Sequence, residues 1–244
     1  MNRSASVDRR AKSSWRSCEC GVGVSRSKDR RMTNDATRVE SITLTTQDGI
    51  ALDARLHSPL GSPVGGIVMS HPHPLYGGDQ HHPLVVAVCD AMAACGWLAV
   101  RFDFRGTNHS GGSHGRGVDE QLDVVAAGDE LRSRLSNGGP VVAAGYSFGA
   151  ATTLSVRDDL LSARIGIALP VSLVQSVPIS LPTLLIHPRH DQYASIADVE
   201  RAADSWSGSA VTLEIVEGAD HFLNGFIQST AARVVEFCEP LHAP

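Results

Sequence analysis

A serine lies between two glycines in the stretch 140-PVVAAGYSFGAAT-152, where a run of small apolar residues leads into residues that favour a helix. The pattern G-x-S-x-G at 145–149 is typical of a nucleophile elbow, a sharp turn from a strand into a helix that exposes the serine hydroxyl. Glycines are needed near the serine because larger side chains would collide with neighbouring elements. Ser147 is therefore a candidate nucleophile. The alternative is an ordinary Gly/Ser turn at the end of a strand.

A serine hydroxyl is a weak nucleophile until a base takes its proton and an acid orients that base. After an elbow of this kind the partners are expected in the order Ser, Asp/Glu, His, each following a later strand. Asp191 follows the apolar strand 183–187, and His221 follows the strand 211–216. Parallel strands present their carboxyl ends at one edge of a sheet, where ligands bind. The order and spacing predict a catalytic triad of Ser147, Asp191 and His221.

Two neighbouring residues are the alternatives for the acid and the base. His190 precedes Asp191, and Asp220 precedes His221. Because Asp220 is adjacent to His221 in the chain, its carboxylate is poorly placed to orient that imidazole. A further alternative assigns these residues no catalytic role: Asp191 would cap a loop, and His221 would be a solvent-exposed histidine.

Acyl transfer also needs two N–H donors for the negative oxygen of the tetrahedral intermediate. One is expected from the backbone of Phe148, the residue after the nucleophile, and the other from the loop 71-HPHPLYGGDQHHP-83. Pro72 and Pro74 have no N–H. This leaves His73 as the natural second donor, in a loop that the prolines stiffen.

The same loop raises the alternative of a metal site, because it holds His71, His73, His81 and His82. No Asp, Glu or Cys stands at a spacing typical of zinc ligands, and the prolines restrict convergence of the imidazoles. We predict neither a metal nor a cofactor.

Length and composition favour one α/β domain. The chain has 244 residues, of which 42% are hydrophobic, and it contains 23 glycines. The run 84–95 is interrupted by Asp90 and is expected to be a buried helix, and no run is long enough to cross a membrane. The five cysteines form no disulfide framework, and no secretory signal is evident, so we expect free thiols and a cytoplasmic protein. They are Cys18, Cys20, Cys89, Cys95 and Cys238.

Charge is unevenly distributed along the chain. Residues 1–31 hold nine Lys/Arg and three Asp/Glu, whereas residues 32–244 carry a net charge of −11. An acidic body argues against nucleic-acid binding by that body. We expect 1–36 to be a disordered basic tail and 37–244 to be the folded domain. A transit peptide and translation from Met32 are alternatives for the tail, and the oligomeric state is not predicted.

Apolar runs and turn residues predict strands and helices that alternate after an initial hairpin. The hairpin covers 39–57 and turns at 47–49. Further strands are expected at 65–71, 97–104, 140–146, 164–170, 183–187 and 211–216. Helices are expected at 83–95, 118–136, from 148 onward, 195–206 and 226–238. Core positions of the helix at 118–136 are expected to be Val118, Leu122, Val125, Leu131 and Leu135. The alternation predicts an α/β fold with a mostly parallel, doubly wound sheet covered on both faces.

Five stretches together resemble the α/β-hydrolase superfamily, and more narrowly the small bacterial hydrolases with an H-P-H-P loop, a dienelactone-hydrolase-like or serine-esterase-like branch. They are 71-HPHPLYGG-78, 101-RFDFRGTNHSGG-112, 145-GYSFGA-150, 187-HPRHD-191 and 219-ADHF-222. The resemblance covers the chain from about residue 40 onward. It implies the α/β-hydrolase fold with an eight-stranded sheet, and it maps the triad and the two donors onto the residues named above. It also implies a structural role for Asp103 and Arg105.

The sequence departs from that family pattern in two places. Pro188 stands where the acid loop usually has glycine, so the path of the chain near Asp191 is expected to differ. The loop after Gly106 continues with 107-TNHS-110 in place of Gly-x-Ser. Dienelactone hydrolases proper use a cysteine nucleophile, so Ser147 argues against that activity.

We therefore predict a serine hydrolase that cleaves a small carboxylic ester or thioester by acyl transfer. The short connection 171–182 leaves no room for a large lid and suggests a shallow cleft, with Tyr76, Val171 and Tyr193 as candidate substrate-binding residues. One alternative is a catalytically silent α/β-hydrolase-fold interaction module. Another makes the basic tail the functional part of the chain.

Overall fold

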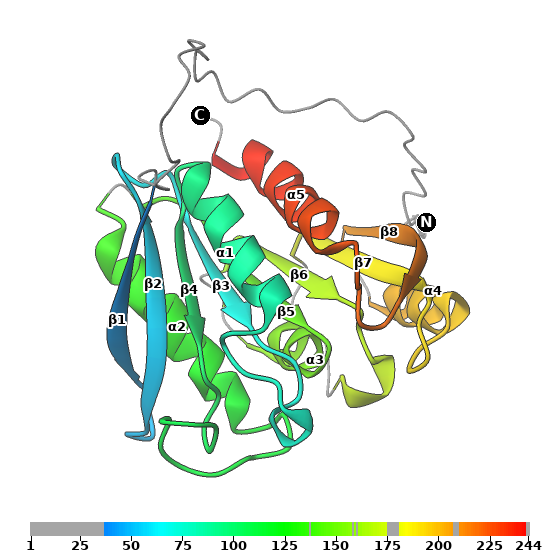
Figure 1. The fold of residues 1–244 in the computed structure, drawn as a ribbon, viewed down its shortest axis with the longest axis horizontal. Helices are drawn as coiled ribbons and strands as arrows, with labels where there is room; N and C mark the ends of the chain where they lie inside the picture. Colours follow the sequence, from blue (N-terminus) through cyan, green and yellow to red (C-terminus); the bar gives the residue numbers. More distant parts are fainter. Residues whose placement is uncertain are drawn as a thin grey trace, which may run out of the picture.

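One eight-stranded sheet forms the centre of the molecule in the computed structural model, which describes residues 37–242 apart from positions 137, 158, 160, 175–180 and 207–209 (Figure 1). The predicted tail at 1–36 lies outside the described residues. The strands are β1 (Thr37–Thr45), β2 (Ala51–Pro59), β3 (Gly66–Ser70), β4 (Leu98–Phe102), β5 (Val141–Tyr146), β6 (Ala163–Ile167), β7 (Thr183–His190) and β8 (Val211–Asp220).

The strands run across the sheet in the order β1-β2-β4-β3-β5-β6-β7-β8. Of these strands, β2 alone runs against the others, because it pairs antiparallel with both β1 and β4. The pairs from β4 to β8 are all parallel. This order confirms the predicted hairpin and the mostly parallel sheet of the α/β-hydrolase fold.

Five α-helices cover the two faces of the sheet. They are α1 (Pro83–Ala94), α2 (Glu120–Arg134), α3 (Phe148–Ser155), α4 (Ile196–Ser205) and α5 (Ile227–Cys238). Figure 1 shows α1 and α5 in front of the sheet, and α2 and α3 behind it. None of the helices in the described part of the chain has the length and apolarity needed to cross a membrane.

The central strands are buried along their whole length, because helices cover both of their faces. Every residue of β3, β4, β5 and β6 is buried. The core beneath α1 and α5 includes Trp97 and Tyr146, and the core beneath α2 includes Phe104 and Phe148. Ser147 therefore stands between the two cores, at the end of the central strand β5.

The buried face of α2 differs from the prediction. Val118 lies before the helix and is 54% exposed, and Leu122 and Val125 are half-buried. Glu120 and Asp123 are fully buried in their place. The prediction was wrong at Val118 and Leu122, whereas Val125 packs against the core as expected. It assumed that only apolar side chains face the core. Buried carboxylates are stable where hydrogen-bond donors surround them.

Arg105 supplies the donors for Asp123. Its Nε and Nη2 donate to Asp123 Oδ1 at 2.9 and 2.8 Å, and its backbone N–H donates to Oδ2 at 2.9 Å. The same guanidinium donates to Asp48 in the hairpin turn at 2.8 Å, and this bond lowers the pKa of Asp48 to about 2. The ion pairs thus join the hairpin turn, the loop after β4 and helix α2.

The start of α3 lies very close to the end of β3. A Cβ atom added at Gly149 would stand 2.5 Å from the carbonyl oxygen of Ser70 and 2.6 Å from that of His71. Both neighbours are backbone atoms, so neither can move aside without shifting a strand. The second elbow glycine therefore sets how closely the serine approaches the loop after β3.

We predict that Gly149→Ala destabilises the fold by roughly 3 kcal/mol or more, since overpacking against backbone forces α3 away from β3. The matched control is Gly128→Ala in α2, where the three atoms nearest to the added Cβ belong to the flexible guanidinium of Arg132, the first at 3.3 Å. The control should change the free energy of unfolding by about 1 kcal/mol at most. Urea unfolding of both variants measures the difference. Equal stabilities would contradict the steric argument.

Candidate active site

The serine of the elbow has a strained backbone. Ser147 has φ 55° and ψ −117°, a conformation that residues with a Cβ rarely adopt. Its N–H donates to Ile167 O at 2.9 Å, and its carbonyl accepts from Ala151 N–H at 3.1 Å. Strain of this kind persists where surrounding bonds enforce it, and it is common at functional sites.

Ser147, His221 and Asp191 form a continuous chain of hydrogen bonds. The Oγ of Ser147 lies 2.9 Å from Nε2 of His221, and Nδ1 of His221 lies 2.8 Å from Oδ2 of Asp191. The side chain of His221 is 6% exposed and that of Asp191 is 1% exposed. Because a carboxylate only accepts, Nδ1 carries the proton and Nε2 is free to accept from the serine hydroxyl.

The register of β7 and β8 brings the acid and the base together. Both strands run further than predicted, to His190 and Asp220, and these two residues pair across the sheet. Asp191 directly follows the end of β7, and His221 directly follows the end of β8. The two residues therefore leave the sheet side by side. The register shifts between Pro188 and His190, at the position where proline replaces the usual glycine. Proline has no N–H for the ladder, which accounts for the irregularity.

Asp191 is held as a carboxylate by hydrogen bonds. Burial raises the pKa of Asp191. The hydrogen bonds from His221 and from the N–H of Tyr193 lower this pKa by more than burial raises it, so the net shift is downward. The bond from Tyr193 measures 2.8 Å and reaches Oδ1, the oxygen that does not face His221. Asp191 is therefore ionised at neutral pH and able to orient the imidazole.

The two alternative residues make other contacts. Asp220 accepts the N–H of Phe222 at 3.0 Å through Oδ1, which makes it a turn residue beside the histidine. The side chain of His190 is exposed. The structure thus brings Asp191, and not Asp220, into contact with the His221 ring.

Two contacts that the sequence did not indicate hold the His221 backbone. The hydroxyl of Tyr146 donates to the carbonyl of His221 at 2.8 Å, and Gln192 Oε1 accepts the N–H of His221 at 3.2 Å. Burial raises the pKa of Tyr146, so its hydroxyl stays protonated and remains a donor. The residue before the nucleophile therefore positions the backbone of the histidine. No spacing rule marks a tyrosine for this purpose.

The H-P-H-P loop is folded tightly against itself. A Cβ at Gly78 would stand 2.2 Å from the carbonyl oxygen of Pro72. The ring of His71 is fully buried, with Nδ1 2.6 Å from Pro72 O and Nε2 accepting from the N–H of Phe104 at 3.0 Å. Burial lowers the pKa of His71 to about 4. A neutral histidine thus connects this loop to the loop after β4.

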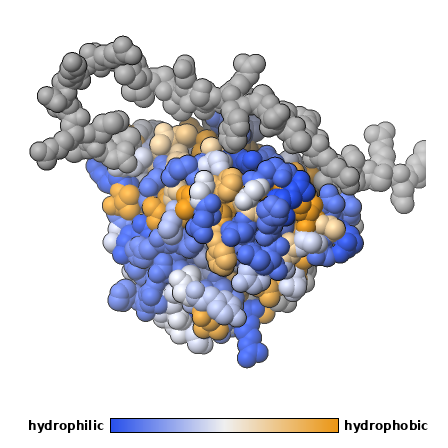
Figure 2. Space-filling model, turned by 45° about the vertical axis from the view of Figure 1, so that its right-hand side comes forward, coloured by the Kyte–Doolittle hydropathy of each residue, from blue (hydrophilic) through white to orange (hydrophobic). Residues whose placement is uncertain are grey.

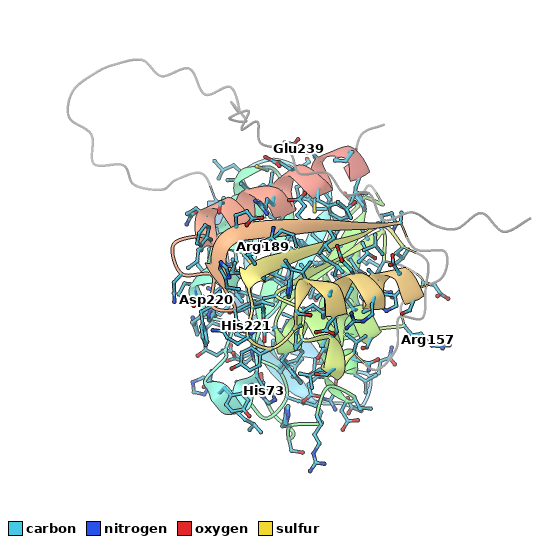
Figure 3. The ribbon with its side chains drawn as sticks, turned by 90° about the vertical axis from the view of Figure 1, so that its right-hand side faces the viewer. His73, Arg157, Arg189, Asp220, His221 and Glu239 are labelled. Carbon is cyan, nitrogen blue, oxygen red and sulfur yellow. The ribbon has the colours of Figure 1, made fainter. Side chains whose placement is uncertain are left out.

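His73 and Phe148 lie next to each other. Their ring centroids are 4.7 Å apart, and Figure 3 shows His73 and His221 on the same side of the molecule. Among the hydrogen bonds of the described residues, neither the N–H of His73 nor that of Phe148 is a donor. Phe148 is the first residue of α3, where N–H groups have no partner within the helix.

The histidines of the loop do not converge on a common point. His73 Nδ1 accepts from Leu75 N–H, and His82 Nδ1 accepts from Leu84 N–H, both at 3.2 Å. His71 is buried against Phe104. Within the part of the chain that the structure describes, no group of three or more His, Cys, Asp or Glu side chains has the arrangement of a metal site.

A pocket of about 230 Å³ opens beside the elbow. Its walls include His73, Leu75, His114, Phe148, Ala151 and Leu173. The spacing of the sequence did not single out Leu75, His114, Ala151 or Leu173, because they come from four separate segments.

The three residues predicted to bind substrate lie around the site in different ways. Tyr193 packs on the ring of His221, with centroids 4.4 Å apart, and Tyr76 packs on the ring of His73 at 4.9 Å. Val171 is half-buried and packs against the core beside α3 and α4. Val171 does not line the pocket, whereas Leu173, two residues further along the chain, does.

Comparisons with known proteins agree with this geometry. The chain is 30% identical over 164 residues to the Rickettsia prowazekii protein RP471, which covers 62% of this chain and 69% of that protein. An α/β serine hydrolase homologue from Coxiella burnetii has a TM-score of 0.72 at 28% identity, over 85% of this chain and 99% of its own. XC6422 from Xanthomonas campestris, a serine hydrolase without a lid, has a TM-score of 0.75 at 24% identity, over 84% and 96%. No protein-family model matches the chain.

These likenesses confirm the predicted α/β-hydrolase fold. The chain belongs to the same family as the Rickettsia protein, and it has the fold of the Coxiella α/β serine hydrolase homologue.

We predict that His71 makes stability pH-dependent. The unfolded chain binds a proton near pH 6.5 and the folded chain only near pH 4, so the unfolded state holds more protons between these values. The free energy of unfolding should fall by roughly 3 kcal/mol from this group as the pH drops across that window. In His71→Gln, whose amide oxygen can still accept from Phe104 N–H, the slope should be shallower. Urea unfolding between pH 4 and 7 compares the two, and identical slopes would refute the assignment.

Proposed function

We propose that the protein is a serine hydrolase that cleaves a carboxylic ester or thioester by acyl transfer. The observation that carries this proposal is the chain of hydrogen bonds from Ser147 Oγ through His221 to Asp191, at 2.9 and 2.8 Å. Base and nucleophile are within the distance at which a proton passes directly. The strained backbone at the half-buried serine supports the same function.

In the first half of the reaction, Ser147 Oγ attacks the carbonyl carbon while Nε2 of His221 takes the hydroxyl proton. The carbonyl oxygen becomes negative and accepts hydrogen bonds from the N–H groups of His73 and Phe148. His221 then donates its proton to the leaving oxygen or sulfur as the bond to carbon breaks. Asp191 stabilises the charged imidazole meanwhile, because its own pKa is lowered.

In the second half, a water molecule attacks the acyl-enzyme and gives its proton to His221. The same two N–H groups stabilise the second tetrahedral intermediate, which collapses to release the acid and to return the proton to Ser147. Apart from the substrate and this water molecule, the groups used in this sequence belong to the chain itself.

The alternative is a catalytically silent module that acts by interaction. Figure 2 shows one face of the molecule, on which hydrophobic residues form small patches between hydrophilic ones. A scaffold gains nothing from holding Ser147 at φ 55°. This backbone strain favours the enzyme.

We predict that Ser147→Ala lowers kcat/KM for a reactive aryl ester by at least about 10⁴-fold and leaves the fold intact, because the nucleophile is lost while the turn remains. Asp191→Asn should lower kcat by on the order of 10³- to 10⁴-fold, since the amide no longer enforces the productive tautomer of His221. The matched control is Ser133→Ala, an exposed serine on α2.

Hydrolysis of 4-methylumbelliferyl acetate, with circular dichroism of each variant, measures these effects. The control should keep the wild-type rate. A folded Ser147→Ala protein with full activity would show that another residue performs the chemistry.

A further inference from the structure

The pocket beside the elbow lies on one particular side of the nucleophile. Its wall residue Phe148 belongs to the core beneath α2 and contacts Phe104 there, with centroids 5.5 Å apart. His221 is held from the other face, by the hydroxyl of Tyr146, whose ring belongs to the core beneath α1 and α5. Of the described residues that line the pocket, none comes from the loops of Asp191 and His221. The pocket and the base therefore stand on opposite sides of Ser147.

This arrangement assigns the two ends of an ester. The leaving oxygen must face Nε2 of His221, because it receives its proton there. The carbonyl oxygen faces the N–H groups of His73 and Phe148. The remaining substituent of the tetrahedral carbon, the acyl chain, then points away from His221 and toward the pocket.

Three rings form the walls of this pocket. The centroids of His73 and Phe148 are 4.7 Å apart, those of His114 and Phe148 are 5.4 Å apart, and those of His73 and His114 are 5.2 Å apart. Burial and the nearby His114 lower the pKa of His73, so its ring is neutral at pH 7. Leu75 and Leu173 add apolar surface to the rings, and Arg116 and Thr152 also line the pocket.

A buried carboxylate keeps one wall in place. Glu120 is fully buried; its two oxygens accept the N–H groups of Gly115 and Gly117 at 2.7 and 2.8 Å, and Oε1 also lies 2.7 Å from His114 Nδ1. Arg116, between these glycines, is held at φ 57°. The loop after β4 is thus fixed with the His114 ring against the pocket, which makes the pocket a pre-formed binding site.

The size of the pocket limits its occupant. An apolar cavity of about 150 Å³ accommodates benzene. A pocket of about 230 Å³ therefore accommodates one substituted ring and encloses only the first part of a long chain. Rings pack favourably on the edges and faces of other rings, beyond the gain from burial alone.

We propose that this is the acyl pocket, and that the substrate is an ester or thioester of a compact aromatic carboxylic acid. The proposal rests on the proposed function and adds the class of acyl group to it. The specificity-determining residues are the wall residues Ala151 and Leu173. Ala151 is buried and Leu173 is 44% exposed, so a larger side chain at either position reduces the space for a ring.

The test compares kcat/KM for 4-methylumbelliferyl acetate, benzoate and decanoate, which share one leaving group. In the wild type, benzoate should be preferred over decanoate. Ala151→Leu and Leu173→Trp should each lower the benzoate-to-acetate ratio by about tenfold or more. Because Leu173 is partly exposed, Leu173→Trp is expected to fold. It therefore still tests the proposal if Ala151→Leu folds poorly. The matched control is Phe222→Ala, on the His221 side, which should keep the ratio within about twofold of wild type.

Three results would overturn the inference. An unchanged benzoate-to-acetate ratio in the folded filling variants would show that the acyl group lies elsewhere. Variants that instead alter preference among acetate esters of different alcohols would assign the pocket to the leaving group. A wild type that prefers decanoate would exclude a compact acyl group. Failure of the proposed function has a separate signature, which is the absence of Ser147-dependent hydrolysis of all three esters.

Discussion

The close approach of α3 to the end of β3 is the constraint on which the site depends. Gly149 permits it, because any side chain there would meet the carbonyl oxygens of Ser70 and His71. The approach brings the first N–H groups of α3 beside the H-P-H-P loop and forces Ser147 into a left-handed backbone conformation. It also packs Phe148 on His73, so that both expected oxyanion donors and one wall of the pocket come from a single contact.

The position of the nucleophile between two cores divides its surroundings into two halves. On the face of α1 and α5, Tyr146 and the paired ends of β7 and β8 hold His221 and Asp191. On the face of α2, buried carboxylates hold the loop after β4 against the pocket. A reaction that needs a proton donor on one side of a carbon and space for a substituent on the other is suited to this division.

The sequence predicted the parts of the site that depend on order and local geometry. The elbow, the succession of strands and helices, and the contact of Ser147, Asp191 and His221 follow from motifs that stand at strand ends. It did not predict the buried carboxylates of α2. The partner of Asp123 is Arg105, which is distant in the sequence, and the partners of Glu120 are backbone N–H groups, which no residue type marks. The pocket was missed for a related reason, since its walls meet only when separate loops have folded.

Labelling with a fluorophosphonate, followed by intact mass measurement, tests the central claim most directly, because the reagent reacts with an activated serine without requiring the correct substrate. We expect one adduct on the wild type, none on Ser147→Ala, and much slower labelling of Asp191→Asn. This result would establish that the hydrogen-bond chain activates Ser147. A well-folded wild type that forms no adduct, or an equal adduct on Ser147→Ala, would contradict the account and favour a silent scaffold or a different nucleophile.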